Sequence, residues 1–193
     1  MAKNDMFARN IPDECYDKLR AFVGAGHQVR VIAFPPEGGN RWVIVTDRDL
    51  FARNIPDECY EKLKEFWAAG NKPTCIAFPY PGGNRWVILA GSALFARGID
   101  DECYQHLVNV SQGKRPAERV AFTKTGGWFI VAKDRYWARR VPDECYEKVG
   151  QFYQGGWLVD HVNSAPNGGW SIITNTRNPN YGADPVRDWE ARV

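Results

Sequence analysis

Between residues 56 and 70 the apolar positions follow the period of an α-helix. Three of them are four and three residues apart and therefore share one helical face: Cys59, Leu63 and Phe66. Pro56 suits the first helical position because its φ angle is fixed, and the two carboxylates that follow suit the positive end of the helix dipole. Gly70 is typical of a helix end. The pattern predicts a helix over this stretch.

Two apolar segments follow this predicted helix. They read TCIAFP and RWVIL, and a PGGN sequence separates them. Apolar runs of this length joined by a glycine turn are typical of a β-hairpin, in which the glycines supply positive φ angles. The sequence therefore predicts a helix followed by two antiparallel strands.

This pattern recurs along the whole chain. An opening motif, FARNIPDECY or a close variant, places alanines at Ala8, Ala52, Ala96 and Ala138, and a glycine pair begins 30 residues after each of them. The copies span 7–50, 51–94, 95–136 and 137–186, and RDWEAR begins a partial fifth motif over 187–193. Asp100 replaces the proline of the third copy and is itself acceptable at a helix start.

One short helix with one hairpin cannot bury its apolar face alone, whereas stacked copies can. We therefore predict a single α+β repeat domain over 1–193, built from four αββ units. Because the fifth motif offers a way to join the ends, we expect a closed or strongly curved, propeller-like array. In this interpretation 187–193 completes the sheet of the first copy.

Composition narrows the function classes. The chain has 25 Lys and Arg against 23 Asp and Glu and shows no basic stripe, which argues against nucleic-acid binding. No apolar run is long enough to span a membrane, and the first residues lack the apolar core of a signal peptide, so we expect a soluble protein. The five cysteines form no CxxC motif and have no histidine at ligand spacing, which favours buried thiols over a metal site or a cofactor.

The repeat also resembles a known family. In the second copy the pattern consists of Tyr60, Leu63, Gly70, Lys72-Pro73, Gly82-Gly83 and Arg85-Trp86. It is similar to bacterial tandem repeats found beside serine-hydrolase domains, as in the N-terminal part of polyglycine hydrolases. The resemblance implies an αββ module of accessory or binding character, without the hydrolase domain.

The candidate ligand-binding residues lie just after the glycine pairs. They are Asn40, Arg41, Trp42, Asn84, Arg85, Trp86, Trp128 and Trp170. Trp and Arg are common at interaction hot spots, so these hairpin ends could contact a peptide, a protein or a glycan. A tryptophan on a strand can equally pack against the helices, and the sequence leaves both roles open.

Each copy also carries an arginine four residues before the aspartate of its DE pair. These candidate ion pairs are Arg9–Asp13, Arg53–Asp57, Arg97–Asp101 and Arg139–Asp143. Because the planar guanidinium suits carboxylates, we expect an Arg–carboxylate bridge that fixes each helix start to the preceding segment or to the next unit.

Three functional hypotheses follow. The first is a non-catalytic module that binds a peptide, a protein or a glycan through its hairpin ends. The second is a structural or engineered scaffold without a ligand. The third is an enzyme with its site in the irregular insert around 181–184. We expect no enzyme, because the SxxK and KTG sequences at 111–114 and 124–126 fall at a predicted helix end and hairpin turn, which is the wrong context for β-lactamase-type chemistry.

Overall fold

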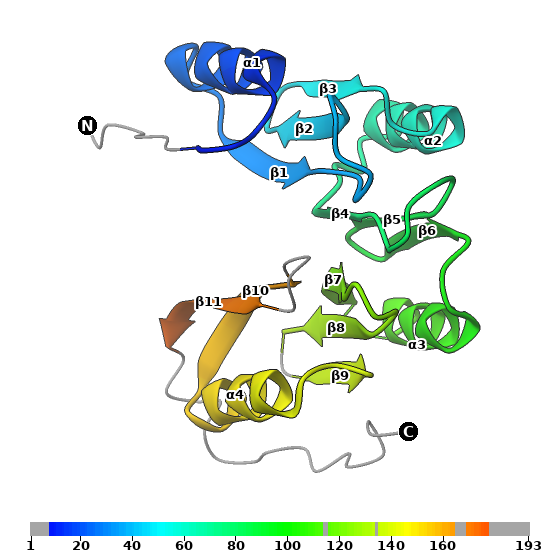
Figure 1. Ribbon diagram of the computed structural model, residues 1–193, viewed down its shortest axis with the longest axis vertical. Helices are drawn as coiled ribbons and strands as arrows, with labels where there is room; N and C mark the ends of the chain where they lie inside the picture. Colours follow the sequence, from blue (N-terminus) through cyan, green and yellow to red (C-terminus); the bar gives the residue numbers. More distant parts are fainter. Residues whose placement is uncertain (1–7, 114–115, 134, 165–168, 178–193) are drawn as a thin grey trace.

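The computed structural model describes residues 8–113, 116–133, 135–164 and 169–177 (Figure 1). The predicted fifth motif at 187–193 and the insert around 181–184 lie outside the described residues. Four helices are present in the described part, one in each copy: α1 (Asp13–Gly24), α2 (Asp57–Ala68), α3 (Asp101–Ser111) and α4 (Asp143–Gln154).

The helices begin and end close to the positions that the sequence predicts. In α2, Pro56 is the N-cap rather than the first helical residue, so the predicted start is one position early. Cys59 and Leu63 are fully buried, and Gly70 has a φ of +77°, a backbone conformation that favours glycine. In α3, Asp100 caps the helix by accepting hydrogen bonds from the backbone N–H groups of Glu102 (3.1 Å) and Cys103 (3.2 Å).

A small antiparallel sheet follows each helix. The strands are β1 (Val29–Ala33), β2 (Trp42–Thr46), β3 (Leu50–Arg53), β4 (Cys75–Ala77), β5 (Trp86–Ala90), β6 (Ala93–Arg97), β7 (Ala117–Phe122), β8 (Trp128–Ala132), β9 (Tyr136–Arg139), β10 (Trp157–Ser164) and β11 (Trp170–Arg177). The strand orders are β1-β2-β3, β4-β5-β6, β7-β8-β9 and β10-β11. The α+β class and the succession of helix and hairpin are therefore as predicted.

The FAR segments form a third strand that belongs to the preceding sheet. Val43 pairs with Ala52, Val87 with Ala96 and Phe129 with Ala138. The segment that opens each sequence copy thus closes the sheet of the copy before it. We define four structural units accordingly: the first (13–53), second (57–97), third (101–139) and fourth (143–177).

Consecutive units are joined by both faces of their sheets. In β5, Trp86 and Ile88 pack with α2 and with the first sheet, whereas Val87 and Leu89 pack against α3 and the third sheet. Successive strand residues point to opposite faces, so a continuous apolar run serves two interfaces. The helices α2, α3 and α4 are therefore each part of a core shared with the preceding sheet, whereas α1 packs on its own sheet, and the units stack into one array.

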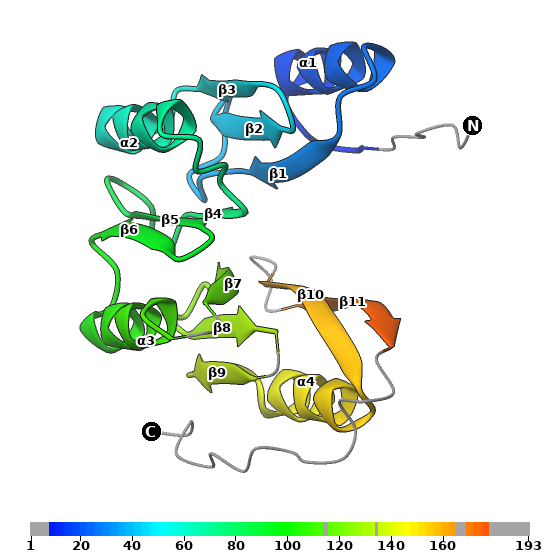
Figure 2. The same cartoon turned by 180° about the vertical axis from the view of Figure 1, so that it is seen from behind.

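The array does not close on itself within the described residues. Each sheet there is separate, and in both views the units follow a C-shaped path that brings the first and fourth units to the same side of the molecule without a shared sheet (Figures 1 and 2). Between them the units follow a curved path. The predicted propeller-like closure is not found in this part of the chain.

Candidate functional site

The tryptophans predicted to contact a ligand lie mostly in the core. Trp42 and Trp86 are fully buried, and each stacks on the aromatic ring of the third strand, Phe51 or Phe95, with centroids 5.3 Å apart. No face of either indole is open to a ligand. Of the two roles that the sequence left open, these two residues have the packing role.

The asparagines of the NRW motif complete this packing. The Nε1–H of Trp42 donates to Oδ1 of Asn40 at 2.7 Å, and Asn40 in turn donates to Glu14 of α1 at 2.6 Å. In the second unit Trp86 donates to Asn84 at 3.0 Å, and Asn84 donates to Glu58. A buried N–H needs an acceptor, so Asn40 and Asn84 satisfy the core indoles instead of contacting a ligand.

The arginines of the FAR segments bind the same glutamates. Arg53 pairs with Glu14 at 3.4 Å, and Arg97 pairs with Glu58. The predicted bridge between a helix start and the next copy of the motif is therefore present in these two units, but the carboxylate belongs to the glutamate of the preceding DE pair and not to Asp57 or Asp101. The third strand of each sheet runs beside the start of its own helix, and this places the guanidinium next to the helix-start glutamate of the same unit.

The third unit follows the same rule, since Arg139 pairs with Glu102. The hydrogen bond from Arg97 lowers the pKa of Glu58 below its ordinary value, against a smaller opposing effect of burial. The predicted pair Arg9–Asp13 is not present among the described residues.

The arginines of the NRW motif have structural contacts as well. Arg41 donates from Nε to the backbone carbonyl of Asn54 at 2.9 Å and pairs with Glu37 at 3.0 Å. Arg85 is exposed and lies against Gly98, where an added Cβ would come within 2.9 Å of its Cγ. Arg41 thus holds the turn of the first unit, whereas Arg85 has only a packing contact with Gly98 within the described part of the chain.

The third unit lacks the asparagine, and its tryptophan shows the consequence. Trp128 is almost completely buried, and its Nε1–H has no hydrogen-bond partner among the described residues. The ring of His106 lies 5.5 Å from the indole centroid. Trp128 is therefore also a core residue, although it is less well satisfied than Trp42 and Trp86.

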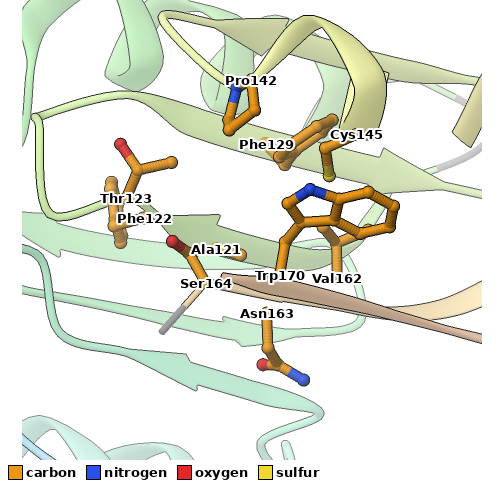
Figure 3. A pocket seen from close by; sticks show the side chains of 10 residues that line it. All are labelled: Ala121, Phe122, Thr123, Phe129, Pro142, Cys145, Val162, Asn163, Ser164 and Trp170. Atoms are coloured by element: carbon orange, nitrogen blue, oxygen red, sulfur yellow. The ribbon is translucent and has the colours of Figure 1, made fainter. Parts of the chain in front are cut away.

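Trp170 differs from the other three tryptophans because it is only half-buried and lines a pocket. The pocket lies between the third and fourth units and is small: it has room for the centre of about one water molecule. Figure 3 shows Trp170, Val162 and Cys145 on one side of it and Thr123 and Phe122 on the other. We call this space the fourth-unit pocket.

A substitution within the repeat explains why a pocket lies here. Ser164 of β10 occupies the position held by a phenylalanine in the other three units: Phe34, Phe78 and Phe122. Phe78 is buried in the core between the first and second units, where it packs with residues of both sheets. The replacement of a phenyl ring by a hydroxymethyl group removes the side chain that fills this interface. Phe129, which stands where the first two units carry Val43 and Val87, adds a ring to the same interface, and the fourth-unit pocket is the small space that remains.

The walls of the fourth-unit pocket are almost entirely apolar. Phe129, Val162 and Trp170 contribute apolar side chains, and Ser164 contributes a hydroxyl at one edge. The hydroxyl of Thr123 is already engaged, since it accepts the backbone N–H of Gly127 at 2.8 Å. Burial raises the pKa of Cys145 to about 11, so its thiol is neutral at physiological pH. Such a surface suits an uncharged apolar group.

Other chemistry is sparse in the described part of the chain. All five cysteines are buried and free, and no group of three or more metal-ligating side chains is present there. None of the described helices has the length and apolar character needed to cross a membrane. Sequence reasoning missed the pocket, although the repeat register contained its signal in the change from phenylalanine to Ser164.

Comparison with known proteins does not assign the chain to a class. No family model, curated protein or solved structure matches it. The functional interpretation therefore depends on the geometry of the repeat and on the place where the repeat is broken.

Proposed function

We propose that this chain is a non-catalytic repeat module that binds a peptide or protein at the fourth-unit pocket. The tryptophans of the first three units lie in the core and Arg41 holds a turn, so the binding role moves from the hairpin ends to the irregular fourth unit. Apolar walls without a set of polar partners favour a peptide or protein over a glycan, because sugar recognition needs hydrogen-bond donors and acceptors.

One observation carries this proposal. At three positions of the repeat a phenylalanine is present, and at the fourth a serine leaves an apolar pocket that faces solvent. An apolar cavity lowers stability, since it forfeits the burial and packing of the missing side chain. A binding partner that fills the space offsets this cost, whereas a purely structural repeat gains nothing from it.

The alternative is a structural scaffold without a ligand. The burial of Trp42, Trp86 and Trp128 favours it, because residues that looked like contact sites serve packing. The presence of a pocket beside Trp170 favours the binding module. The resemblance to repeats that accompany hydrolase domains is compatible with either role.

A selection experiment separates the two functions. Random peptides displayed on phage are selected on the full chain, and each enriched peptide is tested against Ser164→Phe, which fills the pocket with the residue of the other units. We expect at least a tenfold loss of binding to this variant and unchanged binding to Phe34→Ser, a control at the same repeat position on an exposed surface. Failure to enrich any peptide, or binding that Ser164→Phe leaves intact, favours the scaffold.

We also propose that the array remains open, which is the strongly curved alternative and not the closed one of the two that the sequence predicts. Ile32 of the first unit is 43% exposed, whereas Ile76 at the equivalent position of the second unit is 5% exposed. At the other end, the outer face of the fourth sheet carries three polar residues where the earlier sheets carry mostly apolar ones, together with one exposed isoleucine: His161, Asn163, Ser171 and Ile173. Polar outer faces are typical of the end of an open repeat array.

A further inference from the structure

We propose that the open edge of β11 is the docking site for the C-terminal motif of the same chain, residues 187–192, which adds to the fourth sheet as its third strand. The first three sheets have three strands each, whereas β10 and β11 form a two-stranded sheet within the described residues. The motif RDWEAR repeats the sequence RDLFAR of 48–53, which contains β3. This inference goes beyond the proposed function, because it concerns a different surface from the fourth-unit pocket.

The strand β11 is far more exposed than the strands at its position in the other sheets. Every residue of β2, β5 and β8 is buried, and each of these strands lies between two neighbours (Figure 1). In β11, Ser171 is exposed, Ile173 is 52% exposed, and Trp170 and Ile172 are only half-buried. A strand edge beside apolar side chains is a surface to which an extended segment can add.

A glutamate beside this edge matches the arginine of the motif. In the first three units the arginine of the third strand pairs with the glutamate at the start of the helix of that unit. Glu144 is the equivalent glutamate of α4, and it is exposed and makes no ion pair inside the described ranges. The repeat register places Arg192 at the position of Arg53, so the docked motif would give Glu144 the partner that its three counterparts have.

A second pair of charges is expected one helical turn further along α4. Lys18 of the first unit lies over the ring of Phe51 of the third strand, 4.4 Å from its centroid, and the second unit repeats this contact at 4.9 Å. Lys148 occupies the same position in α4, and the motif carries Glu190 where the other third strands carry an aromatic ring. The docked motif would therefore place opposite charges together, with an ion pair in place of the cation–π contact.

The apolar part of the motif fits the exposed isoleucine. In the first sheet Val45 pairs with Leu50 across the two strands. The same register places Trp189 opposite Ile173, where the indole would cover the exposed side chain. Aromatic and β-branched residues are favourable cross-strand pairs. The linker over 178–186 can reach about 30 Å when extended, far more than the ~5 Å between neighbouring strands.

The first sheet does not offer the motif an equivalent place. Its third-strand position is taken by β3, which pairs with β2, and Arg53 already pairs with Glu14. Docking on the fourth sheet therefore replaces the expectation that this motif completes the sheet of the first copy, and it leaves the array open.

Disulfide trapping in the full chain tests the docking. The register pairs position 191 with Ser171, as Ala52 pairs with Val43, and residues opposite each other on neighbouring strands lie within disulfide distance. The double variant Ser171→Cys with Ala191→Cys is compared with a control, Ser171→Cys with Ala183→Cys. The five native cysteines are buried and do not compete. In an undocked tail, position 183 would link faster because it closes a shorter loop.

We expect the pair at 171 and 191 to cross-link at least fivefold faster than the control pair under the same mild oxidant, as measured by mass spectrometry of the digested chain. Adding Arg192→Glu should slow this link at least twofold, and Glu144→Arg in the same chain should restore it. A rate that Arg192→Glu leaves unchanged overturns the role of Glu144. Equal rates for the two pairs, or a faster link at position 183, overturn the docking.

Two further readouts identify other occupants of the edge. Cross-linked dimers on a non-reducing gel would show exchange of the motif between copies, which overturns docking within one chain. A faster link of Ala191→Cys to Ile32→Cys on the first sheet would show closure, and it would overturn the open array together with this inference. None of these results affects the proposal for the fourth-unit pocket, which Ser164→Phe tests separately.

Discussion

In the first two units, the glutamate of the DECY motif connects three parts of its unit at the level of single residues. Glu14 accepts from Asn40, whose oxygen accepts the indole N–H of Trp42, and it also pairs with Arg53 of the third strand. Glu58 makes the corresponding contacts in the second unit. The acidic motif that looks like a repeated ligand site is therefore the point where helix, hairpin and third strand meet.

The link between Asn84 and Trp86 predicts a stability effect. In Asn84→Ala the Nε1–H of the buried indole loses its acceptor, and an unsatisfied buried donor costs about 1–3 kcal/mol. We expect the free energy of unfolding, measured by urea titration, to fall by about that amount. Asn109→Ala, at an exposed position of α3, is the matched control and should stay within about 0.5 kcal/mol of the native chain. Equal effects of the two substitutions would refute the role of Asn84.

The buried thiols predict a pH dependence. Burial raises the pKa of Cys59 to about 12 and that of Cys15 to about 11, from an ordinary value of 9.0. Because the thiols have a higher pKa in the folded chain than in the unfolded chain, their ionisation favours the unfolded chain. The free energy of unfolding is therefore unaffected by these thiols below pH 9 and falls as the pH rises towards their folded-state pKa values. We expect no reaction with a thiol reagent at pH 8 in the folded chain and five reactive thiols after unfolding. Rapid labelling of folded Cys59 would contradict its burial.

At the scale of elements, the residue before each helix determines how the start of that helix is held. Three helices begin after a proline, whereas α3 begins after Asp100, whose side chain caps the helix directly. Asp100 also pairs with Arg140 at 2.8 Å, which connects the start of α3 to the segment after β9. In α3, Asp100 thus holds the helix start with two hydrogen bonds and an ion pair, where the other three helices have a proline.

Asp100 offers a test of this replacement. Asp100→Ala removes the cap and should cost about 1 kcal/mol, whereas Asp100→Asn keeps a capping oxygen and loses only the exposed ion pair, worth less than about 1 kcal/mol. Burial alone would raise the pKa of Asp100, but the hydrogen bond from Cys103 and the charge of Arg140 lower it below its ordinary value. The difference between the native chain and Asp100→Asn should therefore shrink as the pH falls through that pKa. Denaturant unfolding at pH 7 and pH 3 measures this difference in the free energy of unfolding. A difference that is larger at pH 3 than at pH 7 would contradict the ion pair between Asp100 and Arg140.

At the scale of the whole molecule, the two ends of the array differ from its interior. Ile32 and Ile76 occupy equivalent repeat positions, but only Ile76 is covered by a preceding sheet. We expect Ile76→Ala to cost about 2–4 kcal/mol and Ile32→Ala to stay below about 1 kcal/mol in urea unfolding. In a closed ring both residues would be buried, and similar costs would show closure.

The sequence predicted the repeating helix and hairpin because Cys59, Leu63 and the glycine turns give strong local signals. It did not predict the pairing of the third strand, because a four-residue segment such as LFAR carries no register information of its own. The role of Trp86 stayed open because its strand is buried on both faces and shows no alternation. The change to Ser164 was visible, but its consequence depends on where the phenylalanines of the other units lie.

The unfolding free energy of Ser164→Phe tests most directly whether the fourth-unit pocket is open space. If the space is open in solution, the ring fills it, and urea titration should show a gain of about 0.5–2 kcal/mol over the native chain. If other residues already fill the space, the added ring overpacks the junction between the third and fourth units. A loss of about 1–3 kcal/mol would then contradict the pocket and the binding role proposed for it.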